Sequence, residues 1–177
     1  MNKIDIEQWG EFRIGELFEI HPTKAYKLIN NELFIKDGKY PVIVNSSYNN
    51  GIGGYTNLPP TEKGKIITFS DTTSSEAIFF QEKPFVGYPH IQGMYPIGKH
   101  KTLWRKYSLL FFLSIFKSRA ISLNYDYVNK FTRESAKSIV IKLPIDKDGN
   151  PDFSYMETYM KKIAEKTKQK IRRLKLL

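Results

Sequence analysis

One run of apolar residues constrains this chain more than any other feature. Residues 103–118 are apolar nearly all round a helix, and within them residues 109–116 are interrupted only by Ser114. A helix without a polar face has to be enclosed by other elements of a core. A membrane span needs about 20 apolar residues, so this run is too short to be one. We therefore expect a globular protein folded around a buried helix.

The length and the composition narrow the class further. With 177 residues the chain can bury a sizeable core as one domain. It has no cysteine, which excludes disulfide scaffolds, thiolate zinc sites and thiol nucleophiles. The first five residues lack the apolar run of a signal peptide. We expect a cytoplasmic protein that does not enter a membrane.

Short runs rich in β-branched and aromatic residues predict strands around that helix. They lie at residues 40–44, 65–69, 77–80 and 138–143, and residues 85–96 are expected to form a strand with turns. Residues 9–20 are typical of a short strand followed by one helical turn. Residues 45–64 are rich in Asn, Ser, Gly and Pro, which indicates a loop. The predicted fold class is α+β, a mixed and strand-rich globular domain with a buried helix.

A separate helix is predicted at the carboxyl end. The turn-rich linker of residues 146–151 ends in Pro151, which suits the first turn of a helix. The apolar residues that follow recur at the 3-4-3 spacing of a coiled-coil seam: Phe153, Met156, Met160 and Ile163. The seam weakens where Thr167 and Lys170 take the next positions. We predict a globular domain over residues 1–145, and a linker with a coiled-coil-like helix over residues 146–177.

The formal net charge of +10 is concentrated in two basic blocks. Residues 99–142 hold ten Lys/Arg and two Asp/Glu, and residues 161–177 hold eight and one. Such blocks attract phosphate and release counterions when they bind nucleic acid. The second block can equally be the solvated face of a helix. The first is more informative because aromatic side chains interrupt it: Trp104, Tyr107, Tyr125, Tyr127 and Phe131.

Two polar segments offer groups that can read nucleic acid. Residues 45–55 combine Asn and Ser side chains, which can hydrogen-bond base edges or phosphates, with tyrosines that can stack and glycines that allow close approach. Residues 70–76 form a hydroxyl-rich connection between two predicted strands. Each segment can instead be a solvated turn or hairpin.

Catalytic patterns are weak in this chain. Asp71 followed by Gln81-Glu82-Lys83 loosely resembles the acid and the E/Q-x-K pair that hold Mg²⁺ in a nuclease core, but no second carboxylate falls in place. The three histidines lack a shared ligand set, so no metal site is predicted. His90 is expected at most to line a polar surface.

The order of these segments is similar to that of a known family. Residues 9–20, with Trp9 and Phe12 ahead of Ile14-Gly15-Glu16-Leu17-Phe18, resemble the opening of a target recognition domain of type I restriction-modification specificity subunits. Residues 48–55, 66–68 and 83–85 match the spacing of that family. The passage from strand to linker to helix over residues 139–157 looks like the end of these domains, including those of combined type IIB systems.

This resemblance implies a DNA-reading module with no chemistry and no cofactor of its own. In the family, a whole subunit has two such domains, each followed by a long helix, and each domain reads half of a bipartite site. A methyltransferase subunit docks on the helices and brings S-adenosylmethionine, and a restriction subunit can join. This chain has one domain and one helix. It is then either a piece of a longer subunit or a half-subunit that forms a homodimer, for which a palindromic site is expected.

The residues expected to contact double-stranded DNA fall into two sets. The phosphate contacts are assigned to Lys99, Lys101, Arg105, Lys106, Lys117, Arg119, Lys130 and Arg133. The base-reading residues are Ser46, Ser47, Tyr48, Asn49, Asn50, Tyr55, Ser70, Asp71, Thr72 and Thr73. The helix seam of Phe153, Met156, Met160 and Ile163 is expected to hold the dimer or the partner subunit.

Two other functions stay open at this point. The first is a metal-dependent nuclease that uses Asp71 and the Gln81–Lys83 pair, which incubation of plasmid with Mg²⁺ or Mn²⁺ would reveal. The second is a protein-interaction or decoy module that acts through residues 153–177 without touching DNA. A steep salt dependence of DNA binding would separate the recognition module from the second alternative.

Overall fold

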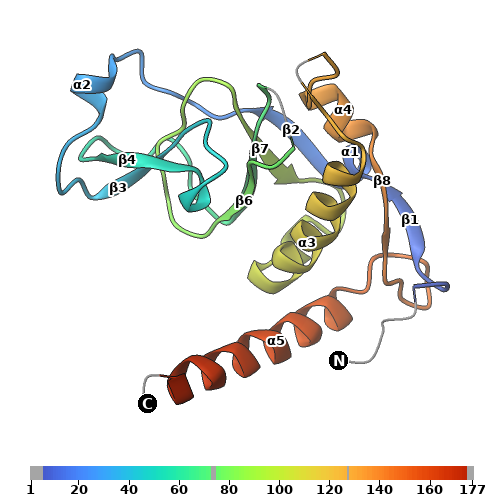
Figure 1. Ribbon diagram of the computed structural model, residues 1–177. Helices are drawn as coiled ribbons and strands as arrows, with labels where there is room; N and C mark the ends of the chain where they lie inside the picture. Colours follow the sequence, from blue (N-terminus) through green and yellow to red (C-terminus); the bar gives the residue numbers. More distant parts are fainter. Residues whose placement is uncertain (1–5, 73–74, 127, 175–177) are drawn as a thin grey trace.

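The computed structural model of this protein describes residues 6–72, 75–126 and 128–174. Its strands are β1 (Gly10–Arg13), β2 (Phe18–Pro22), β3 (Tyr40–Ile43), β4 (Ile52–Thr56), β5 (Ile66–Ser70), β6 (Ile78–Gln81), β7 (Ile91–Pro96) and β8 (Val140–Leu143). Its helices are α1 (Ile14–Leu17), α2 (Asn30–Leu33), α3 (Lys106–Ser122), α4 (Arg133–Ser138) and α5 (Phe153–Leu174), with 3-10 turns η1 (Asn49–Gly51) and η2 (Lys101–Leu103). This mixture confirms the predicted α+β class (Figure 1).

The buried helix α3 lies between a four-stranded sheet and the remaining elements. The sheet is antiparallel with the order β2-β7-β5-β6, and α3 contacts β5 and β6 on one side and β8 and α5 on others. Phe112 and Phe116 are fully buried there, against Phe18 of β2 and Phe69 of β5. Because α3 is covered on several sides, its sequence has no polar face. The second sheet, the antiparallel pair β1-β8, adjoins α3 as well.

A third layer is the two-stranded ribbon β3-β4, at the left of Figure 1. The ribbon is tied to the rest where Ile43 N donates to Val86 O at 3.0 Å. The expectation of a loop throughout residues 45–64 is wrong at β4, which pairs with β3 as a hairpin. Two glycines weaken a strand on propensity alone. Here Gly54 leaves room for the ring of Phe34, which a Cβ would approach to 2.6 Å.

The predicted element boundaries need three corrections. The strand expected at residues 138–143 begins only at Val140, because Ser138 ends helix α4. That helix starts at a capping box in which Ser135 N donates to Thr132 Oγ1 and Thr132 N donates to Ser135 Oγ. Helix α3 begins at Lys106 rather than residue 103, since a 3-10 turn precedes it. The strand within residues 85–96 is confined to β7.

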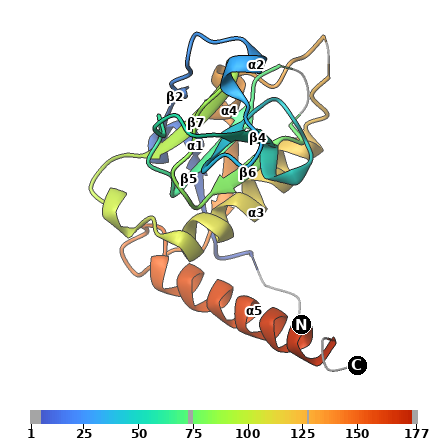
Figure 2. The ribbon, with the colours of Figure 1, turned by 90° about the vertical axis from the view of Figure 1, so that its left-hand side faces the viewer.

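Helix α5 follows the linker as predicted and lies beneath the rest of the molecule (Figures 1 and 2). Its start is capped by Asp152, whose Oδ1 accepts a hydrogen bond from Tyr155 N at 2.9 Å. Phe153 packs edge-on against Trp104, and Met156 is fully buried. The first turns of α5 therefore belong to the same core as α3. Within the described residues, the structure has no helix that is both long enough and apolar enough to cross a bilayer.

Candidate nucleic-acid interface

Three polar loops meet at one end of the four-stranded sheet. They are the loop after β3, the loop after β5 and the turn before β7. Asn45 joins them, because its Nδ2 donates to Pro89 O at 3.2 Å and its Oδ1 accepts from Ser70 Oγ at 3.1 Å. Ser70 Oγ also shares a hydrogen bond with Thr72 Oγ1 at 2.8 Å. Asn45, which directly precedes the first segment predicted to read bases, thus contacts Ser70 at the start of the second segment.

A second set of contacts fixes Asp71 at this meeting point. Gln92 Nε2 donates to Asp71 Oδ2 at 2.7 Å, and Asp71 N donates to His90 O at 3.1 Å. The ring atom Nδ1 of His90 lies 3.4 Å from Asp71 Oδ1, but it is not aligned for a hydrogen bond. Among the described residues, the buried atoms Asp71 Oδ1 and Gln92 Oε1 therefore have no hydrogen-bond partner. An unsatisfied buried acceptor costs about 1–3 kcal/mol, which makes this place unusual.

His90 was expected only to line a polar surface, and neither Asn45 nor Gln92 was among the predicted site residues. His90 has a left-handed backbone with φ of 67°, which is uncommon outside glycine. No sequence pattern marks these three residues, because their proximity depends on strands that pair across 20 or more positions of the chain.

Asn50, one of the predicted base readers, uses its amide inside the protein. Its Nδ2 donates to Phe80 O at 3.3 Å and to Gln81 Oε1 at 3.1 Å. Gln81 Nε2 in turn donates to Asn50 O and to Thr68 Oγ1. Both amide hydrogens of Asn50 are therefore engaged in holding its loop on the sheet.

Other predicted readers present their side chains to solvent. Tyr48 is 82% exposed and Tyr55 is 44% exposed, while Ser47 and Asn49 are exposed beside them. Ser46 is half-buried, and its Oγ accepts from Tyr48 N at 3.2 Å within the loop. Thr73, another predicted reader, lies outside the described residues.

The first basic block does not form one patch. Lys99, Lys101 and Arg105 are exposed and follow the end of β7 that is opposite His90, about 20 Å away for a six-residue strand. The later part of the block, around Phe131, lies against β5 close to the end of that strand. The ring of Phe131, between Lys130 and Arg133, packs 4.9 Å from that of Phe69, next to Ser70.

Several of these cations already have partners. Lys106 pairs with Glu82 at 2.6 Å and Arg133 with Glu134 at 3.3 Å. Arg119 lines a groove with Trp9 and Lys142 on the far side of α3. The lysine and arginine side chains on and near α3 therefore lie on more than one side of this helix.

Lys117 is held close to the start of the polar loops. Its ammonium donates to Ile78 O at 3.3 Å and lies 4.7 Å from the ring centre of Phe79. Partial burial lowers the pKa of this ammonium from its usual 10.5. Lys117 therefore brings positive charge to the base of the 70–77 hairpin without a fully hydrated head group.

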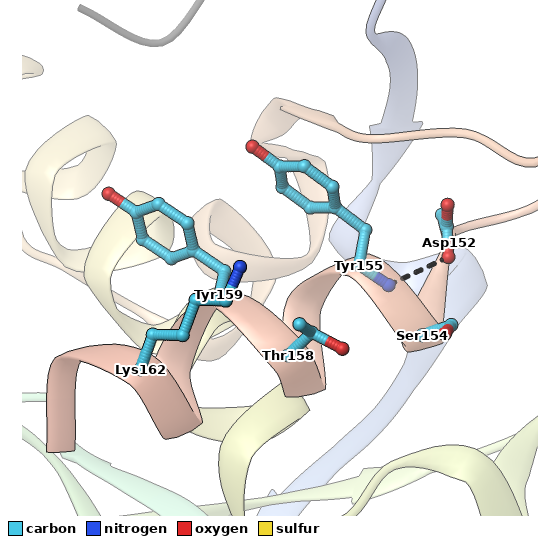
Figure 3. Close-up of a pocket in the computed structure, with 6 residues that line it drawn as sticks. All are labelled: Asp152, Ser154, Tyr155, Thr158, Tyr159 and Lys162. Carbon is cyan, nitrogen blue, oxygen red and sulfur yellow. Dashed lines mark hydrogen bonds between the residues drawn. The ribbon is translucent and has the colours of Figure 1, made fainter. Parts of the chain in front are cut away.

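The predicted seam of α5 is only partly available to another molecule. Met156 is fully buried in the chain's own core, and Phe153 and Met160 pack against that core, whereas Ile163 is partly exposed. Tyr155 and Tyr159 stack with ring centres 6.0 Å apart, next to a shallow groove that Lys162 also lines (Figure 3). Further along, Ile171 and Leu174 are 48% and 70% exposed.

The nuclease alternative has no support in this geometry. Asp71 follows the end of β5 that pairs with the start of β6, whereas Gln81 pairs with Ile66 at the other end of this hairpin. Asp71 and Lys83 thus lie at opposite ends of the hairpin. Nowhere in the ranges that the structure describes do three or more His, Cys, Asp or Glu residues gather as metal ligands.

Comparison with known proteins gives consistent matches. The model of the family described as type I restriction modification DNA specificity domain matches residues 6–175. The specificity subunit S.BcgI of a type II restriction enzyme from Heyndrickxia coagulans is 26% identical over 163 residues, which are 89% of this chain and 44% of that protein.

Two solved structures share the fold. One is the S subunit of a type I restriction-modification system from M. genitalium, with a TM-score of 0.59 and 17% identity over 96% of this chain and 43% of that one. The other is the HsdS subunit from Thermoanaerobacter tengcongensis, with a TM-score of 0.58 and 12% identity over 98% and 42%. The chain thus spans less than half the length of each of these proteins.

Proposed function

The chain belongs to the type I restriction modification DNA specificity domain family, and on that premise we propose that it reads a short sequence of double-stranded DNA for a restriction-modification complex. In this role it binds DNA and leaves the chemistry to its partners. The observation that carries the proposal is the meeting of three polar loops at one end of the sheet, with Lys117 held next to the end of one of them.

Base reading is assigned to the exposed side chains of these loops. Ser47, Tyr48 and Asn49 are exposed in the loop after β3, Tyr55 is exposed on β4, and Thr72 is half-buried in the loop after β5. Amide and hydroxyl groups of this kind discriminate base edges in a groove by about 1–3 kcal/mol for a good two-point contact. Asn50 is engaged within the protein, so we assign it to supporting the loop.

Phosphate contacts are assigned to two groups of lysines and arginines in the basic block, one near the polar loops and one farther away. Lys117, Lys130 and Arg133 flank the loops and are expected to contact the phosphates nearest the bases that are read. Lys99, Lys101 and Arg105, at the other end of β7, would reach phosphates further along the duplex. Both groups add salt-dependent affinity without sequence preference.

Helix α5 is proposed to hold a second copy of the chain and a methyltransferase subunit. The distal part of α5 leaves two large apolar side chains exposed, those of Ile171 and Leu174. Two copies joined there would present two reading surfaces, so the expected target is a palindromic bipartite site. The methyltransferase would bring S-adenosylmethionine, and a restriction subunit would add cleavage.

The test is selection from a randomised duplex library with the purified protein at two salt concentrations. Enrichment of a short motif, doubled about a fixed spacer, is the expected result. Binding without enrichment would contradict autonomous sequence reading. Absence of binding at low salt would contradict DNA recognition and favour a protein-interaction module. The selection is repeated on a variant in which the exposed Lys166, Lys168, Lys170, Arg172 and Arg173 are replaced by Gln, to exclude binding by the basic tail alone.

A further inference from the structure

We propose that His90 reads one base of the target and that Asp71 positions the His90 ring instead of reading a base itself. The proposal rests on the proposed function and adds a residue that neither the sequence patterns nor the family match singles out. It also changes the role of Asp71.

The place of His90 favours contact with DNA. Its side chain is 66% exposed, at the turn where Asn45 ties the three polar loops together through the neighbouring Pro89. Its left-handed backbone is held by the hydrogen bond from Asp71 N to His90 O. Unusual backbone conformations that the surroundings enforce tend to occur where a side chain has to be aimed.

Asp71 is placed to act on that ring and not on DNA. Its side chain is only 21% exposed, its Oδ2 accepts from Gln92, and its Oδ1 is buried. A carboxylate in this position cannot reach a base edge. Its Oδ1 lacks a donor among the described residues, and His90 Nδ1 at 3.4 Å is in reach after a small rotation of the ring. The neutral ring is therefore held with its proton on Nδ1.

This tautomer determines what His90 can read. With the proton on Nδ1, the outer nitrogen Nε2 carries a lone pair and accepts hydrogen bonds. In the major groove the matching donors are the amino groups of adenine and cytosine, while guanine offers acceptors at the corresponding edge. We therefore assign to His90 a preference for adenine or cytosine at one position.

The first experiment reads the tautomer without DNA. Nitrogen-15 NMR of the ring at about pH 8.5, where free imidazole is neutral, is expected to show the proton of His90 on Nδ1. In Asp71→Ala, the acceptor beside His90 Nδ1 is removed, and a neutral imidazole without such a partner favours the proton on Nε2. The proton is then expected on Nε2. A wild-type ring protonated on Nε2, or a tautomer unchanged in Asp71→Ala, would overturn the positioning role.

The second experiment uses the duplex library at the same pH. His90→Gly is expected to lose about tenfold discrimination at one base position and to leave the others unchanged. Asp71→Ala is expected to change the preference at that same position to guanine, because Nε2 becomes a donor. Glycine adopts the left-handed backbone freely, so His90→Gly is expected to fold. Asn124→Gly, at a second left-handed residue distant from the loops in sequence, is the matched control.

Failure of this inference can be told from failure of the proposed function. If the wild type enriches a motif and His90→Gly enriches the same one, base reading by His90 is wrong and DNA recognition stands. If the wild type enriches no motif, DNA reading and the role of His90 in it fall together. The tautomer measurement still decides the link between His90 and Asp71 in that case.

Discussion

Two hydrogen bonds join Asn50, in the loop after β3, to Gln81 at the end of β6. Asn50 Nδ2 donates to Gln81 Oε1 and Gln81 Nε2 donates to Asn50 O, both at 3.1 Å. Gln81 is only 4% exposed, so these contacts fix the 45–51 loop over β5 and β6. The neighbouring Asn49 has the same side chain and a similar left-handed backbone, but its amide makes only a 3.4 Å contact with Ile52 O.

This difference predicts effects of different size on stability for two matched substitutions. Asn50→Gly is expected to lower the free energy of unfolding by about 1–3 kcal/mol, since it leaves Gln81 Oε1 buried without its donor. Asn49→Gly is expected to change it by less than about 0.5 kcal/mol. Glycine suits both backbones, so the comparison isolates the side chains. Urea denaturation measures both values, and equal losses would show that the Asn50–Gln81 contact has no special weight.

Asn49 is instead expected to affect sequence preference. In the library selection, Asn49→Gly should lose discrimination at one base position by about 1–3 kcal/mol if the amide makes a two-point contact. Its salt dependence should match that of the wild type, because no charge is removed. An unchanged motif would remove Asn49 from the reading surface.

The cations beside the loops are predicted to act on all sequences alike. Arg133→Gln should reduce the slope of log affinity against log salt by about 0.9, the value for one lost phosphate contact. The enriched motif should stay the same. Lys147→Gln in the exposed linker removes equal charge outside the proposed interface and should leave the slope unchanged. Equal slopes for all three proteins would contradict a phosphate contact by Arg133.

Arg105 tests how far the interface extends. It lies beyond the end of β7 opposite His90, so its phosphate contact requires that the duplex continue along the sheet. Arg105→Gln is expected to lower the slope in the same way with duplexes of full length. With duplexes shortened toward the motif, its effect should vanish before that of Arg133→Gln. An effect that does not depend on duplex length would contradict this arrangement.

Much of the fold could be predicted because local signals and packing agree. The apolar run around Phe112 indicated a buried helix, and Pro151 with Asp152 marked the start of α5. Helix α4 was missed because Ser135, rather than Glu or Gln, completes its capping box. Strand β4 was missed because its two glycines are unfavourable in a strand, and only their packing explains them, with Val44 against Gly53 and Phe34 against Gly54.

The candidate site was predictable as segments and not as individual residues. Asn49 and Asn50 are adjacent and identical in type, yet only one of them is engaged by Gln81. Which of the two asparagines contacts Gln81 depends on the position of β6 in the fold. His90 lacked any motif, since its link to Asp71 exists only after β5 pairs with β7.

Tyr95 provides a prediction about pH. Its hydroxyl donates to the buried Glu62 at 2.8 Å, and burial followed by this hydrogen bond raises the pKa of Tyr95 above its usual 10.0. A raised pKa adds stability that is complete below pH 10 and is lost as the pH rises above it, because the unfolded chain ionises first. Tyr95→Phe is expected to be less stable than the wild type by about 1–2 kcal/mol at pH 8.

The difference between these two proteins should shrink above about pH 10. Urea denaturation at a series of pH values measures it, and the other tyrosines cancel in the comparison. A difference that stays constant up to about pH 11 would contradict the raised pKa of Tyr95.

The start of helix α5 is expected to contribute to folding, and its distal part is expected to contribute to assembly. Met156 is fully buried, so Met156→Ala is expected to lower the free energy of unfolding by about 2–5 kcal/mol. Leu174 is 70% exposed, so Leu174→Glu should leave the unfolding of the dilute protein unchanged. If the distal helix joins two copies, Leu174→Glu should convert a dimer to a monomer in sedimentation equilibrium, because it places a carboxylate in an apolar seam.

Gln169→Glu is the matched control for this assembly test. It introduces the same carboxylate on an exposed position of α5 outside the seam, and it should remain a dimer. Loss of the dimer in both variants would indicate that the charge of the helix, and not the seam, holds the copies together. A wild type that stays monomeric at high concentration would leave the second reading surface to another domain or subunit, and would contradict the palindromic site expected of a homodimer.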